Sequence, residues 1–114
     1  MTADDFRRAA LALPEAVEQG HMGHPDFRVG GRIFASLDDG GTRGCLKLAP
    51  EHQEMLLEAE PGLFEAAAGY WGRKGWTYLK LADADEAAMR GVLTASWLNT
   101  APASLAKAFK GAPG

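Results

Sequence analysis

The chain has 114 residues, of which 46% are hydrophobic and 24% are charged, and its formal net charge is −3. This length fits a single domain over residues 1–114 and is too short for two independent cores. The composition excludes disordered and fibrous proteins. The single cysteine excludes a disulfide framework and a cysteine-cluster metal site. The acidic balance argues against a surface built as a whole to coat nucleic acid.

Targeting signals are missing from the sequence pattern. No segment reaches the roughly 18 consecutive apolar residues of a membrane span. The opening MTADDFRR carries acidic residues and lacks the apolar stretch of a signal peptide. We therefore expect a cytoplasmic protein with no membrane partner.

The first predicted element is a helix over residues 2–13. Thr2 and Asp5 have the spacing of a capping box, and Phe6 and Leu13 fall on one apolar stripe. Pro14 ends the helix, because a proline pushes the residue before it out of the helical region.

Residues 17–48 alternate in short runs that predict a β-meander of three or four strands. Gly30 and Gly31 tolerate the positive φ angles of a tight hairpin turn. The Asp-Asp-Gly-Gly run at 38–41 predicts a second turn, so the strand between the two turns spans 32–37.

The remaining predicted elements are a helix at 50–60, a strand at 76–81, a helix whose apolar stripe ends at Trp97, and a short helix carrying Leu105 and Phe109. The glycine-spaced segment 69–75 precedes a strand and lacks a following Gly-Lys-Ser/Thr, so it reads as a flexible connector rather than a phosphate loop. The element order favours an α+β fold in which an antiparallel meander sheet carries helices mainly on one face.

No catalytic constellation emerges from the reactive side chains. His21 and His24 are three residues apart but lack the further ligands that zinc requires. Cys45 stands alone in a predicted strand with no base placed to activate it. We therefore expect no enzyme activity, no metal and no small-molecule cofactor.

Strict alternation along the strands predicts two unlike sheet faces. The face toward the helices would carry Ile33, Ala35, Leu37, Leu46, Leu48, Leu79 and Leu81. The opposite face would carry Arg28, Arg32, Phe34, Ser36, Cys45, Lys47, Trp76, Tyr78 and Lys80, with no acidic residue among them. Three explanations stay open for this second face: a nucleic-acid surface, a protein or homodimer interface, or a core region covered by the final helix.

Charge is also unevenly distributed along the chain. Five glutamates lie between residues 51 and 65, whereas no lysine or arginine occurs between 48 and 72. A net charge of −3 is therefore compatible with a local basic patch.

Five ordered segments cover nearly the whole chain and carry a family resemblance. They are LALPEAVEQ (11–19), GHPDFRVGGRIFASL (23–37), CLKLAPE (45–51), RKGWTYLKL (73–81) and ASWLNTAP (95–102). Together they resemble the MmcQ/YjbR family. The resemblance implies a compact domain with an antiparallel sheet, similar in fold to type III secretion chaperones. It also implies DNA binding through a double-wing arrangement, and it supplies no catalytic residues.

These observations lead to the interpretation of a DNA-binding protein with double-stranded DNA as its partner. The candidate nucleic-acid-binding residues are Arg28, Arg32, Arg43, Lys47, Arg73, Lys74, Trp76, Tyr78 and Lys80. The alternative is a non-enzymatic protein-interaction or homodimerisation module that uses the same sheet face.

Overall fold

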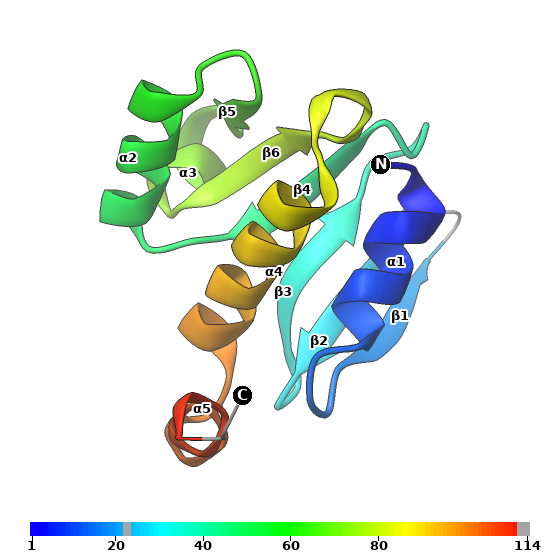
Figure 1. Ribbon diagram of the computed structural model, residues 1–114, viewed down its shortest axis with the longest axis vertical. Coiled ribbons are helices and arrows are strands. Elements are labelled where there is room, and N and C mark those ends of the chain that lie inside the picture. Colours follow the sequence, from blue (N-terminus) through cyan, green and yellow to red (C-terminus); the bar gives the residue numbers. More distant parts are fainter. Residues whose placement is uncertain (22–23, 112–114) are drawn as a thin grey trace.

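The computed structural model describes residues 1–21 and 24–111. The strands in this part of the chain are β1 (Val17–His21), β2 (His24–Val29), β3 (Arg32–Leu37), β4 (Arg43–Lys47), β5 (Phe64–Ala66) and β6 (Trp76–Lys80). The helices are α1 (Ala3–Leu11), α2 (Pro50–Ala59), α3 (Gly69–Arg73), the 3-10 turn η1 (Leu81–Asp83), α4 (Glu86–Thr100) and α5 (Ala103–Lys110). The strands form one sheet in the order β1-β2-β3-β4-β6-β5, and every neighbouring pair is antiparallel (Figure 1).

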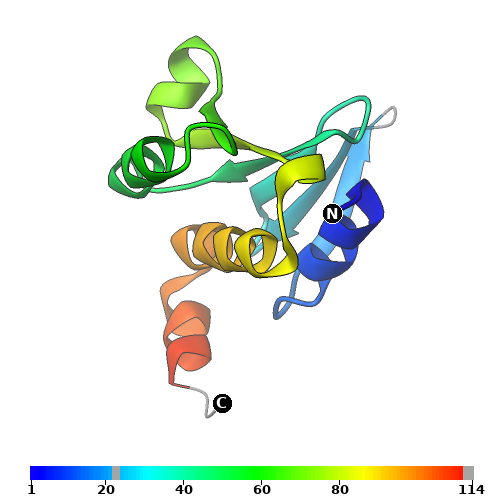
Figure 2. The same ribbon diagram turned by 45° about the horizontal axis from the view of Figure 1, so that its top comes forward.

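The helices lie on the sheet in two unequal layers. Helices α1 and α4 pack against one face, and α5 follows α4 on that side, whereas the short α3 lies on the other side (Figure 2). The structure thus confirms an α+β fold with helices mainly on one face of an antiparallel sheet. None of the helices in the described residues is long and apolar enough to cross a membrane.

Helix α1 begins where its capping residues predict. The Thr2 hydroxyl accepts a hydrogen bond from the backbone N–H of Asp5 at 3.1 Å, and the Asp5 carboxylate accepts one from the backbone N–H of Thr2 at 2.8 Å. This backbone hydrogen bond from Thr2 lowers the pKa of Asp5. The reciprocal bonds satisfy donors that a helix N-terminus leaves free, which sets the start at Ala3.

The hairpin between β2 and β3 has the two-residue glycine turn expected from the sequence. Gly30 and Gly31 have φ angles of 59° and 79°, which an ordinary L-residue rarely adopts. Val29 pairs with Arg32 directly across this turn, and Arg28 pairs with Ile33.

A β-bulge in β3 overturns one part of the predicted face assignment. Phe27 pairs with Ala35 while the next residue, Arg28, pairs with Ile33, so Phe34 is an extra residue on β3. Both Phe34 and Ala35 are fully buried in the core. Because Phe34 and Ala35 both point into the core, the alternation of β3 is shifted by one residue before the bulge. The predicted inward position of Ile33 and the predicted outward position of Phe34 are therefore both wrong.

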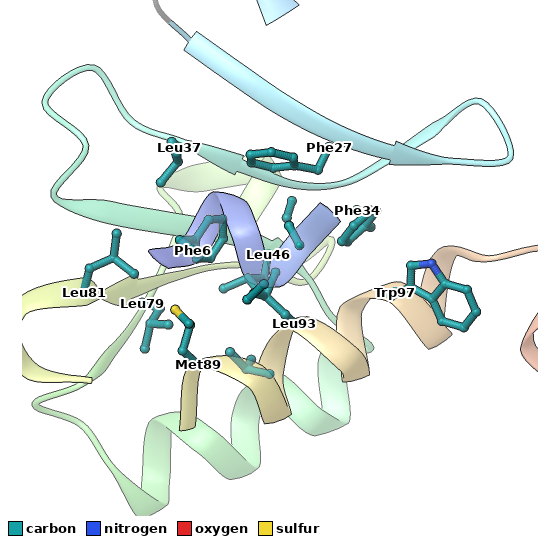
Figure 3. Close-up of a cluster of buried hydrophobic side chains, with 14 of the residues drawn as sticks. Phe6, Phe27, Phe34, Leu37, Leu46, Leu79, Leu81, Met89, Leu93 and Trp97 are labelled. Carbon is teal, nitrogen blue, oxygen red and sulfur yellow. The ribbon is translucent and has the colours of Figure 1, made fainter. Parts of the chain in front are cut away.

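The core fills the space between the sheet and helices α1 and α4 (Figure 3). Phe6 and Trp97, expected in the core from their helical stripes, are both 0% exposed. The Trp97 indole N–H donates to the carbonyl of Pro14 at 3.0 Å, so the polar group of this buried ring has a hydrogen-bond partner. A Cβ at Gly44 would lie 2.3 Å from the Phe6 ring, which explains why β4 carries glycine where α1 crosses it.

Segment 69–75 is more ordered than a flexible connector. It forms α3, and its glycines allow close backbone packing: a Cβ at Gly72 would lie 1.9 Å from the carbonyl oxygen of Ala67. A Cβ at Gly75 would lie 1.9 Å from the carbonyl oxygen of Leu48, and the φ angle there is 103°. The glycine spacing is therefore a packing requirement that holds α3 against the sheet.

Candidate nucleic-acid interface

The face of the sheet opposite α1 and α4, called the open face below, brings several predicted site residues together. Ser36 pairs with Cys45 and Cys45 with Tyr78, and partners across antiparallel strands share a face. In the next row Lys47 pairs with Trp76. These five side chains are all half-buried, as expected of a surface that the final helix does not cover. The explanation that α5 folds over these aromatics is wrong, because Phe109 of α5 packs on Trp97, with ring centroids 5.0 Å apart.

Arg32 does not belong to the open face. Its cross-strand partner is Val29, whose side chain is in the core, so Arg32 projects from the helix-bearing side of the sheet. The side chain is exposed at the start of β3. The prediction that Arg28 and Arg32 share a face is wrong, because a two-residue hairpin places them in adjacent rows that point to opposite faces.

A groove of about 480 Å³ runs over the open face beneath α3. We call it the aromatic groove; its lining residues are His24, Asp26, Ile33, Ser36, Leu37, Cys45, Ala67, Ala68, Trp71, Trp76 and Tyr78. Trp71 comes from α3, whereas Trp76 and Tyr78 come from β6. Trp71 is 61% exposed, and its neighbour Tyr70 is 55% exposed, with the two rings edge to face at 5.4 Å.

The α3 end of the groove is basic. The Lys47 ammonium donates to the backbone carbonyl of Lys74 at 2.6 Å and lies 5.7 Å from the centre of the Trp76 ring. Burial, and secondarily the charge of Lys74, lowers the pKa of Lys47. Lys74 itself lies 5.3 Å from the centre of the Tyr70 ring, and Arg73 is exposed in the same short helix.

Lys47, Arg73 and Lys74 together are called the basic rim. Within the described residues, none of the three has a carboxylate oxygen within 4.0 Å. Their charges are therefore available to an anionic ligand.

The opposite end of the groove has its cations matched by acids. The ion pairs there are Arg28–Asp26 at 2.9 Å and Arg43–Asp38 at 3.2 Å, and the His24 Nε2 lies 2.7 Å from an Asp39 carboxylate oxygen. The hydrogen bond that Arg28 donates to the Asp26 carboxylate raises the pKa of Arg28 further. The expectation of an open face without acids is wrong, because β2 places Asp26 beside Arg28 on that face.

Arg43 is held in place by two neighbours. Its guanidinium lies 4.0 Å from the centre of the Tyr78 ring and donates to Asp38. Burial disfavours the Asp38 carboxylate, but hydrogen bonds from the backbone and side chains of Arg43 and Thr42 outweigh it, and the pKa of Asp38 is lowered. Lys80 pairs with Arg43 across the strands and is exposed. Arg43 thus supports the turn and the Tyr78 ring, and it is less free than Lys80 to bind a ligand.

Cys45 lies on the groove floor as an inert thiol. Burial raises its pKa to about 11, so the thiol is protonated at neutral pH. Over residues 1–21 and 24–111, no three histidine, cysteine or acidic side chains gather closely enough to hold a metal ion. Gly23, which precedes His24, lies outside the described residues.

Sequence reasoning missed the residues that shape the groove wall. Trp71 and Tyr70 were placed in a connector, although two adjacent aromatics in a polar segment are an unusual composition for one. Ile33 was assigned to the core, and Asp26 was given no place on the face. The two-residue hairpin could have predicted both positions. It pairs Arg28 with Ile33, so Ile33 shares the face of Arg28, and Asp26, two residues before Arg28, lies on that face as well.

Comparisons with known proteins agree with this fold. A family model described as YjbR matches residues 11–99. The crystal structure of the Deinococcus radiodurans protein DR2400, described with a DUF419 domain, is similar with a TM-score of 0.72 and 27% sequence identity; the match covers 86% of this chain and 77% of that chain. No curated protein matches the sequence. The fold and the extent of the family match lead to one conclusion: the chain belongs to the YjbR family.

Proposed function

We propose that this protein is a DNA-binding module that uses the α3 end of its open face. The observation that supports this most is the meeting of exposed aromatic rings with the basic rim. Trp71 stands beside the groove while Lys47 and Lys74 lie over neighbouring rings at its edge. Aromatic faces that can stack on bases, next to cations that can contact phosphates, are the combination used by nucleic-acid-binding surfaces.

The proposal is narrower than a surface spread over the whole meander. Arg28 and Arg43 are engaged by Asp26 and Asp38, and Arg32 projects from the other face. A phosphate that approached Arg28 would have to displace or tolerate a carboxylate, at a cost in electrostatic free energy. Binding therefore depends on the basic rim, with Lys80 as a peripheral contact.

A binding function fits this site better than catalysis. The thiol of Cys45 is a poor nucleophile, because its pKa is about 11. Asp26 and Asp38 are engaged in ion pairs with Arg28 and Arg43, and Asp39 contacts the His24 imidazole. What the groove offers a ligand is ring surface and charge.

The test is fluorescence anisotropy with a labelled DNA duplex at about 50 mM salt, where electrostatic contacts are strong. We expect binding whose log–log salt slope is about −3, because three cations contact phosphates at roughly −0.9 each. The exposed pair Arg73→Glu/Lys74→Glu should remove most of this affinity. The control Arg32→Glu/Lys107→Glu makes the same change in net charge at exposed residues outside the open face. This variant should keep most of the DNA affinity.

A protein interface on the same face is the competing function. Exposed Trp71 and Tyr70 would also suit a second copy of the chain, since aromatics are enriched at interfaces. Light scattering on the same samples distinguishes the two. A salt-resistant dimer that fails to bind DNA at high micromolar concentration would overturn the DNA proposal, whereas a DNA-binding species dependent on the basic rim supports it.

A further inference from the structure

The aromatic groove has the dimensions of a site for a small planar group. Its volume of about 480 Å³ lies within the range of small-ligand pockets and exceeds what one nucleobase occupies. The walls differ: Trp71 and Trp76 present ring surface, whereas Ser36 and Asp26 present polar atoms farther along. A planar base with polar edges matches such a lining.

The wall formed by α3 is fixed before any ligand arrives. Gly72 lets the helix approach the carbonyl of Ala67 so closely that a Cβ would not fit, and Gly75 does the same at Leu48. The Tyr70 ring also supports Trp71 edge to face, with an interplanar angle of 78°. A stacking surface that is already in place loses little conformational entropy when a base binds.

On the sheet side, a buried hydrogen-bond network holds Trp76. The Gln53 amide donates to the Trp76 carbonyl at 3.0 Å and to the Thr77 hydroxyl at 3.0 Å. That hydroxyl in turn donates to the carbonyl of Gly75 at 3.0 Å. Helix α2 thereby fixes the strand backbone that carries the second groove tryptophan.

The charges along the groove limit how a polyanion can lie in it. The basic rim is at the α3 end, and Asp26 lines the far end. Beyond it, Asp38 and Asp39 line an adjoining pocket. On the β5 side, Glu65 pairs with Tyr78 and so shares the open face. A phosphate chain that followed the whole groove would meet those acids. Charge complementarity instead places phosphates at the rim and the uncharged base inside.

We propose that the aromatic groove binds one unpaired base of a single-stranded segment, stacked on Trp71 and Trp76, while Lys47 and Lys74 contact the adjacent phosphates. The proposal rests on the DNA-binding function above and specifies the form of its ligand. In a duplex the base faces are stacked on each other and cannot reach the two rings. A single strand offers them at little cost, so the protein prefers it to duplex.

The experiment compares a labelled oligothymidylate of about 15 nucleotides with a duplex of equal length. We expect at least about 10-fold tighter binding of the single strand, because a stacked base contributes strongly to such affinities. Its log–log salt slope should be about −1.4, since two phosphate contacts contribute roughly −0.7 each in single strands. An oligouridylate of the same length tests the sugar: tight binding of the oligothymidylate supports the proposal, whereas binding of the oligouridylate alone would overturn it together with the DNA-binding function.

Variants then test the stacking directly. Trp71→Ala should weaken single-strand binding about 10-fold or more, and Trp71→Phe should restore much of it. Met55→Ala removes a comparably exposed apolar side chain, 57% exposed on α2 outside the groove, and should change nothing. Because Trp71 is exposed, unchanged thermal unfolding of Trp71→Ala would show that the fold is intact.

The two proposals fail in different ways. Equal or tighter duplex binding, or full single-strand binding by folded Trp71→Ala, overturns the base-binding groove and leaves the DNA-binding function standing. Failure of the protein to bind any of the oligonucleotides overturns both. Single-strand preference that depends on Trp71 supports both.

Discussion

The two faces of the sheet are made by the same strands but differ in how deeply their side chains are buried. On the helix-bearing face Phe27, Phe34 and Leu46 are fully buried against α1 and α4. On the open face Ser36, Cys45 and Tyr78 of the same strand set remain half-buried along a groove. Substitutions on one face need not disturb the other, so stability and the proposed binding can be tested separately.

The largest expected effect tests which residue of β3 faces the core. Phe34→Ala should lower the free energy of unfolding by about 3–5 kcal/mol, because it leaves a cavity among buried side chains. Ile33→Ala, one position earlier but on the groove, should cost less than about 1.5 kcal/mol. Urea denaturation measures both. The reverse ranking would show that β3 follows strict alternation without the bulge.

A second prediction concerns the burial of the Cys45 thiol at the centre of the open face. Burial raises the pKa of Cys45 from 9.0 to about 11. At about pH 8 the folded protein should then react with a thiol reagent about 100-fold more slowly than the denatured chain, because the thiolate fraction is that much smaller. Absorbance of the released thiol product gives both rates. Equal rates would mean that the groove floor is fully hydrated.

A third prediction contrasts two glycines that differ only in what surrounds them. Gly72→Ala should destabilise the protein by more than about 1 kcal/mol, because the new Cβ clashes with the Ala67 carbonyl. Gly91→Ala, at an exposed position of α4 where the new Cβ would meet nothing within 4 Å, should stabilise it by about 0.5–1 kcal/mol. Thermal unfolding provides the readout. A stable Gly72→Ala protein would contradict close packing of α3 on the sheet.

The smallest expected effect sharpens the contrast between the two ends of the groove. Asp26→Asn removes the carboxylate that engages Arg28 and should strengthen oligonucleotide binding about 2-fold to 3-fold at low salt. Glu51→Gln, an equal charge change on exposed α2, is the control and should have less effect. Anisotropy titrations distinguish them, and an equal gain in both variants would indicate a net-charge effect alone.

Much of the fold follows from local patterns in the sequence. The stripe ending at Trp97 predicted the core side of α4, and Gly30-Gly31 predicted the hairpin turn. Each of these depends on residues close together in the chain. The core positions Leu46 and Leu79 were also correct, because β4 and β6 alternate without interruption.

The wrong face assignments in β3 arise because its two neighbouring strands require different registers, which only tertiary packing reconciles. The hairpin places Phe34 on the same side as Phe27, whereas pairing with β4 places Ala35 on the side of Leu46. Both sets are apolar, so one extra residue in β3 reconciles them. Reading β3 alone cannot reveal this, but comparing the two registers could have done so.

The candidate site was predictable only in its strand residues. Register brings Lys47 to Trp76 and Cys45 to Tyr78, as alternation implied. Trp71 could not be placed, because a five-residue helix is stabilised by its contacts with the sheet more than by its own sequence. The place of Asp26 on the open face also follows from alternation, because it lies two residues before Arg28 on β2, but the prediction used only the charge of Arg28.

The three tryptophans provide the most direct test of the account, since two lie in the groove and one lies in the core. A titration with the single-stranded oligonucleotide, monitored by ¹H–¹⁵N correlation NMR, follows each indole N–H separately. We predict that the signals of Trp71 and Trp76 shift in proportion to binding, while that of Trp97, bonded to Pro14 in the core, stays in place. Stationary Trp71 and Trp76 signals at saturating oligonucleotide, with shifts elsewhere on the protein, would contradict the assignment of binding to the open face.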